Sequence, residues 1–197
     1  MDEPIRPVNG EGLSASALRA ELEKHHRASY GWSLGCCRSN RTEAEDVLQS
    51  VYLKVLSGKA RYDGRAAFRT WLFAVIRRTA IDAHRRAVFR RWWLTDFRPD
   101  DDGGPAGAGR EAPVDEPAFR TLFRRELDAL AARQREALHL VFYQEMSVQQ
   151  AAEVMGVSLG SARTHYERGK RRLRERLTAS PLYHETGFPR PNAHVAL

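Results

Sequence analysis

A segment rich in glycine and proline divides this chain of 197 residues into two parts. Residues 98–117 read RPDDDGGPAGAGREAPVDEP and contain almost no large apolar side chain. Such a composition cannot bury enough apolar surface to offset the conformational entropy that is lost on folding. We therefore expect a flexible linker. Its six acidic and two basic residues make it net acidic.

On both sides of this segment, apolar residues recur at three- and four-residue spacing, which is the pattern of amphipathic helices. The N-terminal part is expected to form helices over about 14–37, from about Thr42, where Glu45 completes a capping-box pattern, and over about 65–91. On the first helix, Leu18, Leu22, His25 and His26 are expected to share a stripe. The core stripe expected on the second helix consists of Ala44, Val47, Leu48, Val51, Tyr52 and Val55. On the third helix it consists of Phe68, Leu72, Val75, Ile76, Thr79 and Ala83.

The C-terminal part is expected to begin with one long amphipathic helix. Its inward residues would be Leu127, Leu130, Leu138, Val141 and Phe142. No strand pattern occurs, so the predicted fold class is all-α, with two small helical domains joined by a flexible acidic linker. The predicted boundaries are 13–95 for the first domain, 96–117 for the linker and 118–178 for the second domain, followed by a disordered tail, 179–197.

The second domain contains the sequence order of a helix-turn-helix. Ser147 begins a short helix, and Gly156 follows where a tight turn between helices needs a residue that tolerates positive φ. Val157 is expected to pack under this turn. Ser158 then stands where a side-chain oxygen can cap the next helix.

That last helix carries seven cations and two glutamates between Arg163 and Arg176. Its first turn is built from small residues, which allow close approach to a DNA groove, and Arg163, Thr164 and His165 can reach base edges. The later cations suit phosphate contacts. A solvated basic helix without a partner is the simpler interpretation, but a short helix, a glycine turn and a cap precede this one in the right order. The predicted DNA contacts are Ser158, Gly160, Ser161, Arg163, Thr164, His165, Arg168, Lys170 and Arg171.

Composition narrows the possible partners and functions. The net charge of +7 favours a polyanion such as nucleic acid. The apolar runs are too short to span a bilayer, and the first residues lack the basic and apolar segments of a signal peptide, so we expect a cytoplasmic protein without membrane insertion. No phosphate-binding glycine loop, HExxH or nucleophile elbow occurs, so we expect neither an enzyme nor a cofactor. The adjacent pairs His25, His26 and Cys36, Cys37 would chelate poorly, so no metal site is predicted either.

Two sequence stretches resemble a known family. VSLGSARTHYERGKRRLRERL, preceded by LAARQREALHLVFYQEMSVQQAAEVMG, resembles the region of bacterial extracytoplasmic-function sigma factors that binds the minus-thirty-five promoter element. In the first domain, AEDVLQSVYLKVL resembles their helix that docks on the clamp of RNA polymerase. FRTWLFAVIRRTAIDAHRR resembles their helix that melts and reads the minus-ten element. Together these matches cover about residues 15–92 and 120–177.

The resemblance implies a sigma factor that binds core RNA polymerase and directs it to promoter DNA, and it allows an anti-sigma factor as a regulatory partner. The implied polymerase contacts are Asp46, Gln49, Ser50 and Lys54, which would otherwise be ordinary solvated surface. The implied minus-ten contacts are Arg61, Tyr62, Arg65, Arg69, Trp71, Arg77, Arg78, Arg85 and Arg86. Among these, Trp71 lies beside the core stripe and favours packing over base stacking.

The recognition helix departs from the family pattern. Thr164-His165 stands where Ser-Arg is usual, and Ser161-Ala162 stands where Thr-Val is common, so the promoter sequence is not predicted. Helix-turn-helix response regulators also carry Thr-His, and they are the alternative: a transcription regulator that does not replace the sigma factor. Such proteins usually add a receiver domain with parallel strands, and residues 1–95 show no such pattern.

Overall fold

The computed structural model describes residues 13–94 and 118–180, and the surroundings of side chains over 13–89 and 121–180. Within these ranges every element is a helix and no strand occurs, so the all-α prediction is confirmed. The expected linker and most of the expected tail lie outside the described residues.

The N-terminal unit consists of α1 (Ala15–Lys24), α2 (His26–Cys36), α3 (Arg41–Leu56) and α4 (Phe68–Leu94). The prediction of one helix over 14–37 is wrong, because the backbone leaves helical geometry at His25, where φ is −98° and ψ is 4°. The His25 ring is buried, stacks on Phe68 with ring centres 6.1 Å apart, and lies 3.4 Å from the Glu21 carboxylate. His26 is exposed, so the two histidines do not share a stripe.

Helix α3 begins one residue after Asn40, whose side-chain oxygen accepts a hydrogen bond from the backbone N–H of Glu43 at 3.2 Å. The N-cap of α3 is therefore Asn40 and not Thr42, which the sequence had predicted. The start of α4 is also displaced, to Phe68, because the Tyr62 hydroxyl donates to the Ala66 carbonyl at 2.6 Å and holds the preceding residues in a loop.

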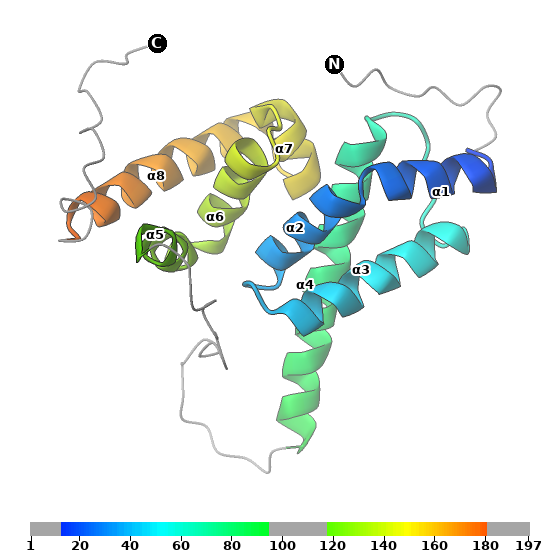
Figure 1. The fold of residues 1–197 in the computed structure, drawn as a ribbon, viewed down its shortest axis with the longest axis horizontal. Coiled ribbons are helices and arrows are strands. Elements are labelled where there is room, and N and C mark those ends of the chain that lie inside the picture. Colours follow the sequence, from blue (N-terminus) through cyan, green and yellow to red (C-terminus); the bar gives the residue numbers. More distant parts are fainter. Residues whose placement is uncertain (1–12, 95–117, 181–197) are drawn as a thin grey trace.

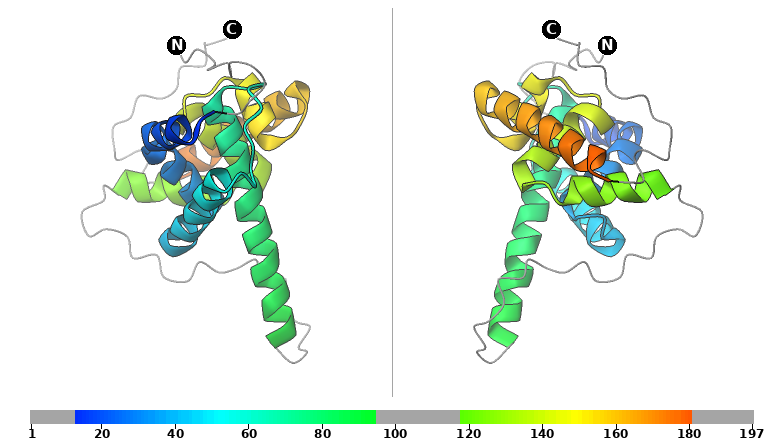
Figure 2. Two further views of the ribbon diagram at one scale, coloured as in Figure 1. Left: turned by 90° about the vertical axis from the view of Figure 1, so that its right-hand side faces the viewer. Right: turned by 90° about the vertical axis from the view of Figure 1, so that its left-hand side faces the viewer.

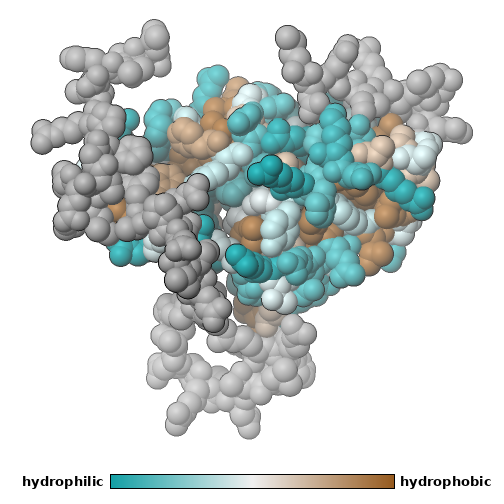
Figure 3. Space-filling view, viewed as in Figure 1, coloured by the Kyte–Doolittle hydropathy of each residue, from teal (hydrophilic) through white to brown (hydrophobic). Residues whose placement is uncertain are grey.

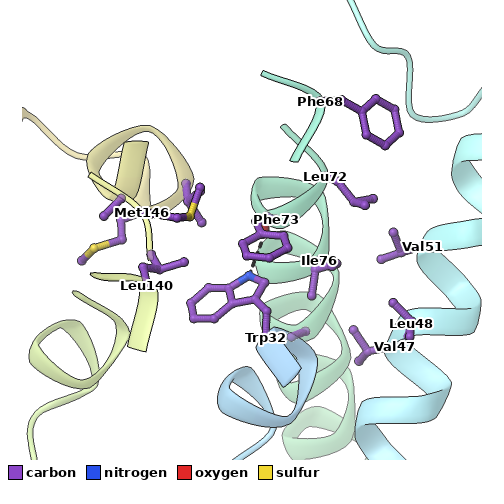
Figure 4. Close-up of a cluster of buried hydrophobic side chains, with 14 of the residues drawn as sticks. Trp32, Val47, Leu48, Val51, Phe68, Leu72, Phe73, Ile76, Leu140 and Met146 are labelled. Atoms are coloured by element: carbon purple, nitrogen blue, oxygen red, sulfur yellow. Dashed lines mark hydrogen bonds between the residues drawn. The ribbon is translucent and has the colours of Figure 1, made fainter. Parts of the chain in front are cut away.

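Helices α2, α3 and α4 pack around one core (Figure 4). The indole N–H of Trp32 donates to the carbonyl of Phe73 at 3.0 Å, and the Ser33 hydroxyl donates to the carbonyl of Ala44 at 2.8 Å, so polar bonds fix both neighbours of α2. The expected core stripes are largely confirmed, although Tyr52, Val75 and Ala83 are only half-buried. The fully buried members are Ala44, Val47, Leu48, Val51, Val55, Phe68, Leu72, Ile76 and Thr79.

The C-terminal unit consists of α5 (Ala118–Asp128), α6 (Ala132–Leu138), the π-helical segment η2 (His139–Tyr143), α7 (Val148–Met155) and α8 (Leu159–Thr178). The expected single long helix is interrupted after α5. There the Arg135 guanidinium donates to the carbonyls of Asp128 (3.0 Å) and Leu130 (3.3 Å), which satisfies groups that the helix end leaves unpaired.

The residues expected to face inward from this stretch divide into two groups. Leu127, Leu130 and Leu138 are buried and Val141 is half-buried, but Phe142 is 56% exposed, so its inward assignment is wrong. The wider π-helical turn of η2 shifts later residues away from the register of an α-helix, which moves Phe142 off the buried face.

The two units pack directly against each other. Helix α7 lies against α4 and η2 lies against α2, and one cluster of buried residues includes Trp32 and Phe73 from the first unit with Leu140 and Met146 from the second. The C-terminal half of α4 projects well beyond this body (Figures 1 and 2). Sequence periodicity missed Phe73, because α4 buries a second face against the C-terminal unit.

His139 lies at the junction of the two units. Its ring is 5.3 Å from the Trp32 ring and 5.2 Å from the Tyr143 ring, centre to centre, and it hydrogen-bonds to the backbone of Gly31. Burial lowers the pKa of His139 to about 4, and the positive charge of Arg135 contributes in the same direction. The imidazole is therefore neutral at physiological pH.

The close packing of α6 against α8 can be tested by substituting Gly169, which lies in the interior of α8. A Cβ added there would lie 3.1 Å from the Gln134 Cβ and 3.2 Å from both the Gln134 carbonyl and a Leu138 methyl. Gly169→Ala should therefore lower the free energy of unfolding in urea, although alanine has the higher helix propensity by about 1 kcal/mol. Gly160→Ala on the same helix meets nothing within 4 Å and should leave stability unchanged or raised. A stabilised Gly169→Ala protein would contradict the packing described here.

His139 should make stability depend on pH. Its pKa is lowered from 6.5 to about 4 in the folded chain, so the unfolded chain binds more protons between these values. Stability is then fully present above about pH 6.5 and falls as the pH is lowered toward 4. Urea unfolding across this range should show a smaller loss in His139→Gln than in the unsubstituted chain. Equal losses would show that His139 is not buried as a neutral ring.

Candidate nucleic-acid interface

Helix α8 is positioned by the turn that precedes it. Ser147 and Gln150 form a reciprocal capping box at the start of α7, with bonds of 3.1 and 2.9 Å. Gly156 ends α7 at φ 64°, and the Ser158 hydroxyl oxygen accepts from the backbone N–H of Ser161 at 3.1 Å. The predicted helix start at Ser147 is confirmed, with Ser147 itself as the N-cap, and so are the turn at Gly156 and the cap at Ser158. Val157 packs half-buried against the core.

One side of α8 is buried and the opposite side is open. Ala162, Gly169 and Leu173 are buried on the side where α8 contacts α5, α6 and α7. The first turns therefore present their predicted DNA contacts outward. Ser158, Gly160, Ser161, Arg163, Thr164, Arg168 and Arg171 are exposed, and His165 and Lys170 are half-exposed.

Several polar groups on α8 already have partners. Lys170 lies 3.3 Å from the Glu167 carboxylate and above the Tyr166 ring, and Arg171 is 3.9 Å from Glu175. The Thr164 hydroxyl donates to the carbonyl of Gly160 at 3.0 Å. Arg163 and Arg168 are exposed and, among the described residues, make no ion pair.

The far end of α8 is held by α5. The Glu126 carboxylate accepts from Arg176 at 2.7 Å and from Arg125 at 2.9 Å. Burial disfavours the charged form of Glu126, but the hydrogen bonds and charges of these two arginines prevail and lower its pKa. Arg176 therefore has a structural role in joining α8 to α5, whereas the cations nearer the N-terminus of α8 do not.

The outer face of α3 carries the residues assigned to polymerase. Asp46, Gln49 and Ser50 are exposed, but the Lys54 ammonium donates to the Thr79 hydroxyl at 2.9 Å and is half-buried against α4. Leu53 (64% exposed) and Leu56 (47% exposed) were missed by sequence reasoning, although both fall opposite the core stripe. Two exposed leucines beside polar residues suit a protein contact.

The residues assigned to the minus-ten element divide into three groups. Tyr62 is buried and Trp71 is half-buried. Each ring lies 5.2 Å from the Phe68 ring, and the two lie 5.3 Å from each other, centre to centre, so they support the loop. Arg69 and Arg77 are directed toward the C-terminal unit. The exposed remainder consists of Arg61, Arg65, Arg78, Arg85 and Arg86.

Arg69 and Arg77 bridge the two units. One Arg69 nitrogen donates to both the backbone carbonyl and the side-chain oxygen of Gln144, and the guanidinium lies over the Phe73 ring. Arg77 Nε is 3.1 Å from a Glu136 carboxylate oxygen, and both side chains are mostly buried.

Metal binding and thiol chemistry find little support in this part of the chain. Over 13–94 and 118–180, no three histidine, cysteine or acidic side chains are grouped as metal ligands. Cys36 and Cys37 are free thiols, and burial raises the pKa of Cys37 to about 11 and that of Cys36 well above its ordinary value. Both thiols are therefore protonated at neutral pH, and thiolate reactivity is low.

No described helix is long and apolar enough to cross a membrane. The face seen in Figure 3 is mainly hydrophilic, with hydrophobic residues in small separate patches. Among the described residues, the exposed large hydrophobic side chains are Leu53 and Leu56 on α3, Val88 and Phe89 on α4, and Phe142 and Tyr143 in η2.

Two known family patterns match the chain. Residues 22–90 match the family described as Sigma-70 region 2, and residues 120–173 match Sigma-70, region 4. The sigma factor CarQ of Myxococcus xanthus is 32% identical over 139 residues, which cover 70% of this chain and 76% of CarQ. The sigma factor SigD of Mycobacterium tuberculosis, of the extracytoplasmic-function type, is 28% identical over 198 residues and covers 91% of each chain.

Solved structures share the fold. RpoE of Bartonella quintana, in complex with the anti-sigma factor NepR, superposes with a TM-score of 0.61 at 23% identity and covers 82% of this chain and 97% of RpoE. CnrH, in complex with the cytosolic domain of CnrY, gives 0.57 at 18% identity and covers 85% of this chain and 91% of CnrH.

Proposed function

Since the chain belongs to the extracytoplasmic-function family of bacterial RNA polymerase sigma factors, we propose that its two helical units divide promoter recognition and polymerase binding between them. The chain is a sigma factor that binds core RNA polymerase and directs it to specific promoters. We assign 13–95 to region 2, 96–117 to the linker, 118–178 to region 4 and 179–197 to a tail.

The observation that carries this proposal is the open first half of α8. Small residues occupy its first turn, Arg163 and Arg168 are exposed without ion pairs among the described residues, and a capped turn fixes its direction. A helix of this kind can enter the major groove with Arg163, Thr164 and His165 toward the bases. Arg171 and Lys170 would then meet phosphates.

Region 2 would supply the other contacts. We assign polymerase binding to Asp46, Gln49 and Ser50, together with the exposed Leu53 and Leu56. Lys54 supports that face through its bond to Thr79. For the minus-ten element we assign the exposed arginines of the loop and of α4 to DNA and Tyr62 and Trp71 to support of the loop. Arg69 and Arg77 would join the DNA contacts only if the units separate.

The remaining assignments follow from this role. A sigma factor is an initiation factor, and we propose that this chain has no catalytic activity and acts in the cytoplasm, where bacterial promoters are. The RpoE–NepR complex is a sigma factor bound by an anti-sigma factor, so we propose that such a partner regulates this chain too. The response-regulator alternative has no support, because the N-terminal part matches sigma region 2 where a receiver domain would stand.

Polymerase binding is tested by changing the exposed polar face of α3. Asp46→Ala with Gln49→Ala should weaken binding to core RNA polymerase at least tenfold and reduce transcription in vitro from promoters of the source genome. Both side chains are exposed, so circular dichroism and thermal unfolding should not change. Normal polymerase binding by the double variant would show that the clamp assignment is wrong. If the unsubstituted chain started no transcription with core polymerase, the proposed function itself would fail.

Base reading is tested at Arg163. Arg163→Ala should lower holoenzyme affinity for a cognate promoter by roughly 1–3 kcal/mol and relax the preference at one minus-thirty-five base pair. Arg172→Ala, which removes an exposed cation from the opposite flank of α8, is the matched control. It should alter binding to all duplexes alike or not at all. If Arg163→Ala weakened every sequence equally, Arg163 would be a phosphate contact instead of a base reader.

A further inference from the structure

Glu167 is an acidic residue on the open surface of the proposed recognition helix. It follows Arg163 by four residues and Thr164 by three, so it lies about one helical turn beyond both on α8. Its side chain is 62% exposed. Helix α8 buries Ala162 and Gly169 on its other side. Glu167 therefore belongs to the same open face as the residues assigned to bases.

A carboxylate at this position opposes the charge pattern around it. Between Arg163 and Arg176, α8 carries seven cations, and a surface that meets DNA phosphates gains affinity from such charges. A glutamate that faced a phosphate would repel it and lower the affinity for every DNA sequence. The carboxylate can strengthen DNA binding only where it meets hydrogen-bond donors, and in the major groove these donors belong to the bases.

The ion pair between Glu167 and Lys170 does not account for the glutamate. The Lys170 ammonium lies 3.3 Å from both carboxylate oxygens, and the two side chains are 62% and 41% exposed. Exposed pairs of this kind contribute little to stability. The ammonium also lies 5.1 Å from the centre of the Tyr166 ring, a contact that holds it without the glutamate. The pair does place a cation beside the carboxylate, which offsets the repulsion of neighbouring phosphates.

The chemistry of a carboxylate selects one base among the four. An ionised carboxylate only accepts hydrogen bonds. In the major groove, the donors are the N4 amino group of cytosine and the N6 amino group of adenine, and adenine places its N7 acceptor beside the amino group. A carboxylate that approaches adenine therefore meets a like partial charge, whereas cytosine itself presents only the donor. Guanine and thymine present acceptors and no donor.

We propose that Glu167 is a specificity-determining residue of the minus-thirty-five contact and accepts a hydrogen bond from the N4 amino group of a cytosine. This inference rests on the proposed function. Four residues of α-helix rise about 6 Å and successive base pairs are about 3.4 Å apart, so the cytosine should lie about two base pairs from the pair that Arg163 reads. Glu167 thereby adds one position to the sequence that the helix reads.

The base preference of the holoenzyme tests this assignment. The full chain with core RNA polymerase is bound to cognate promoter duplexes randomised over the minus-thirty-five element, and the bound duplexes are sequenced. The unsubstituted chain should prefer cytosine at one position by at least about fivefold. Glu167→Gln should change that preference to adenine, because a glutamine amide both donates and accepts and so matches N7 and N6 of adenine. Glu167→Ala should abolish the preference at this position, and the other positions should keep theirs.

Glu175→Gln is the matched control on the same helix. Glu175 is the other carboxylate of α8, its side chain is 61% exposed, and it lies 3.9 Å from Arg171, about two turns after Glu167. Both glutamine substitutions remove one exposed negative charge, so both should raise the affinity for all duplexes to a similar small extent. Neither should change the circular dichroism or the thermal unfolding. Only Glu167→Gln should change a base preference.

Two results would overturn the inference. One is an unchanged preference at every position in both Glu167→Gln and Glu167→Ala. The other is an equal loss of affinity for all duplexes in Glu167→Ala, which would show that the glutamate supports the helix and reads no base. Failure of the proposed function would look different, because the unsubstituted chain would then form no holoenzyme that selects promoters, and the inference would fall with it.

Discussion

The burial of Trp32 is the interaction on which most of this structure depends. Its indole N–H is satisfied by the Phe73 carbonyl, so a large aromatic side chain with a polar atom can be almost completely buried. That single bond fixes α2 against α4. The rings of Trp32 and Phe73 then form a surface that α3 supports from one side and that η2 and α7 cover from the other.

Because the apolar core continues through this surface, the two sequence units are structurally coupled although the segment between them cannot form a core of its own. Polar contacts join the same two units. Arg77 pairs with Glu136, and Arg69 donates to Gln144, so both link α4 to the second unit. Helix α4 is thus paired along one edge to the second unit, while its C-terminal half projects beyond the body of the protein (Figure 2). Which arginines of α4 are free to contact a ligand therefore depends on packing as well as on composition.

Sequence reasoning was most accurate where one local pattern determines the outcome. The turn at Gly156 and the cap at Ser158 could be predicted residue by residue, because a left-handed glycine and a hydroxyl cap have few substitutes. It failed where distant residues decide. The break at His25 depends on Phe68, and the second buried face of α4 depends on residues about 65–80 positions later. Exposure of Phe142 follows from a π-helical turn that no spacing rule reveals.

The same contrast, between local sequence patterns and contacts of distant residues, explains which features of the candidate site the sequence could predict. The family resemblance selected Arg69 and Arg77 as DNA contacts, but sequence alone cannot show that a carboxylate and a glutamine from the other unit already bind them. In this structure both guanidinium groups are bound across the contact between the two units, so the DNA role proposed for them requires the units to separate. Glu136 therefore has a role that periodicity could not suggest: its carboxylate pairs with Arg77 across the contact between the two units.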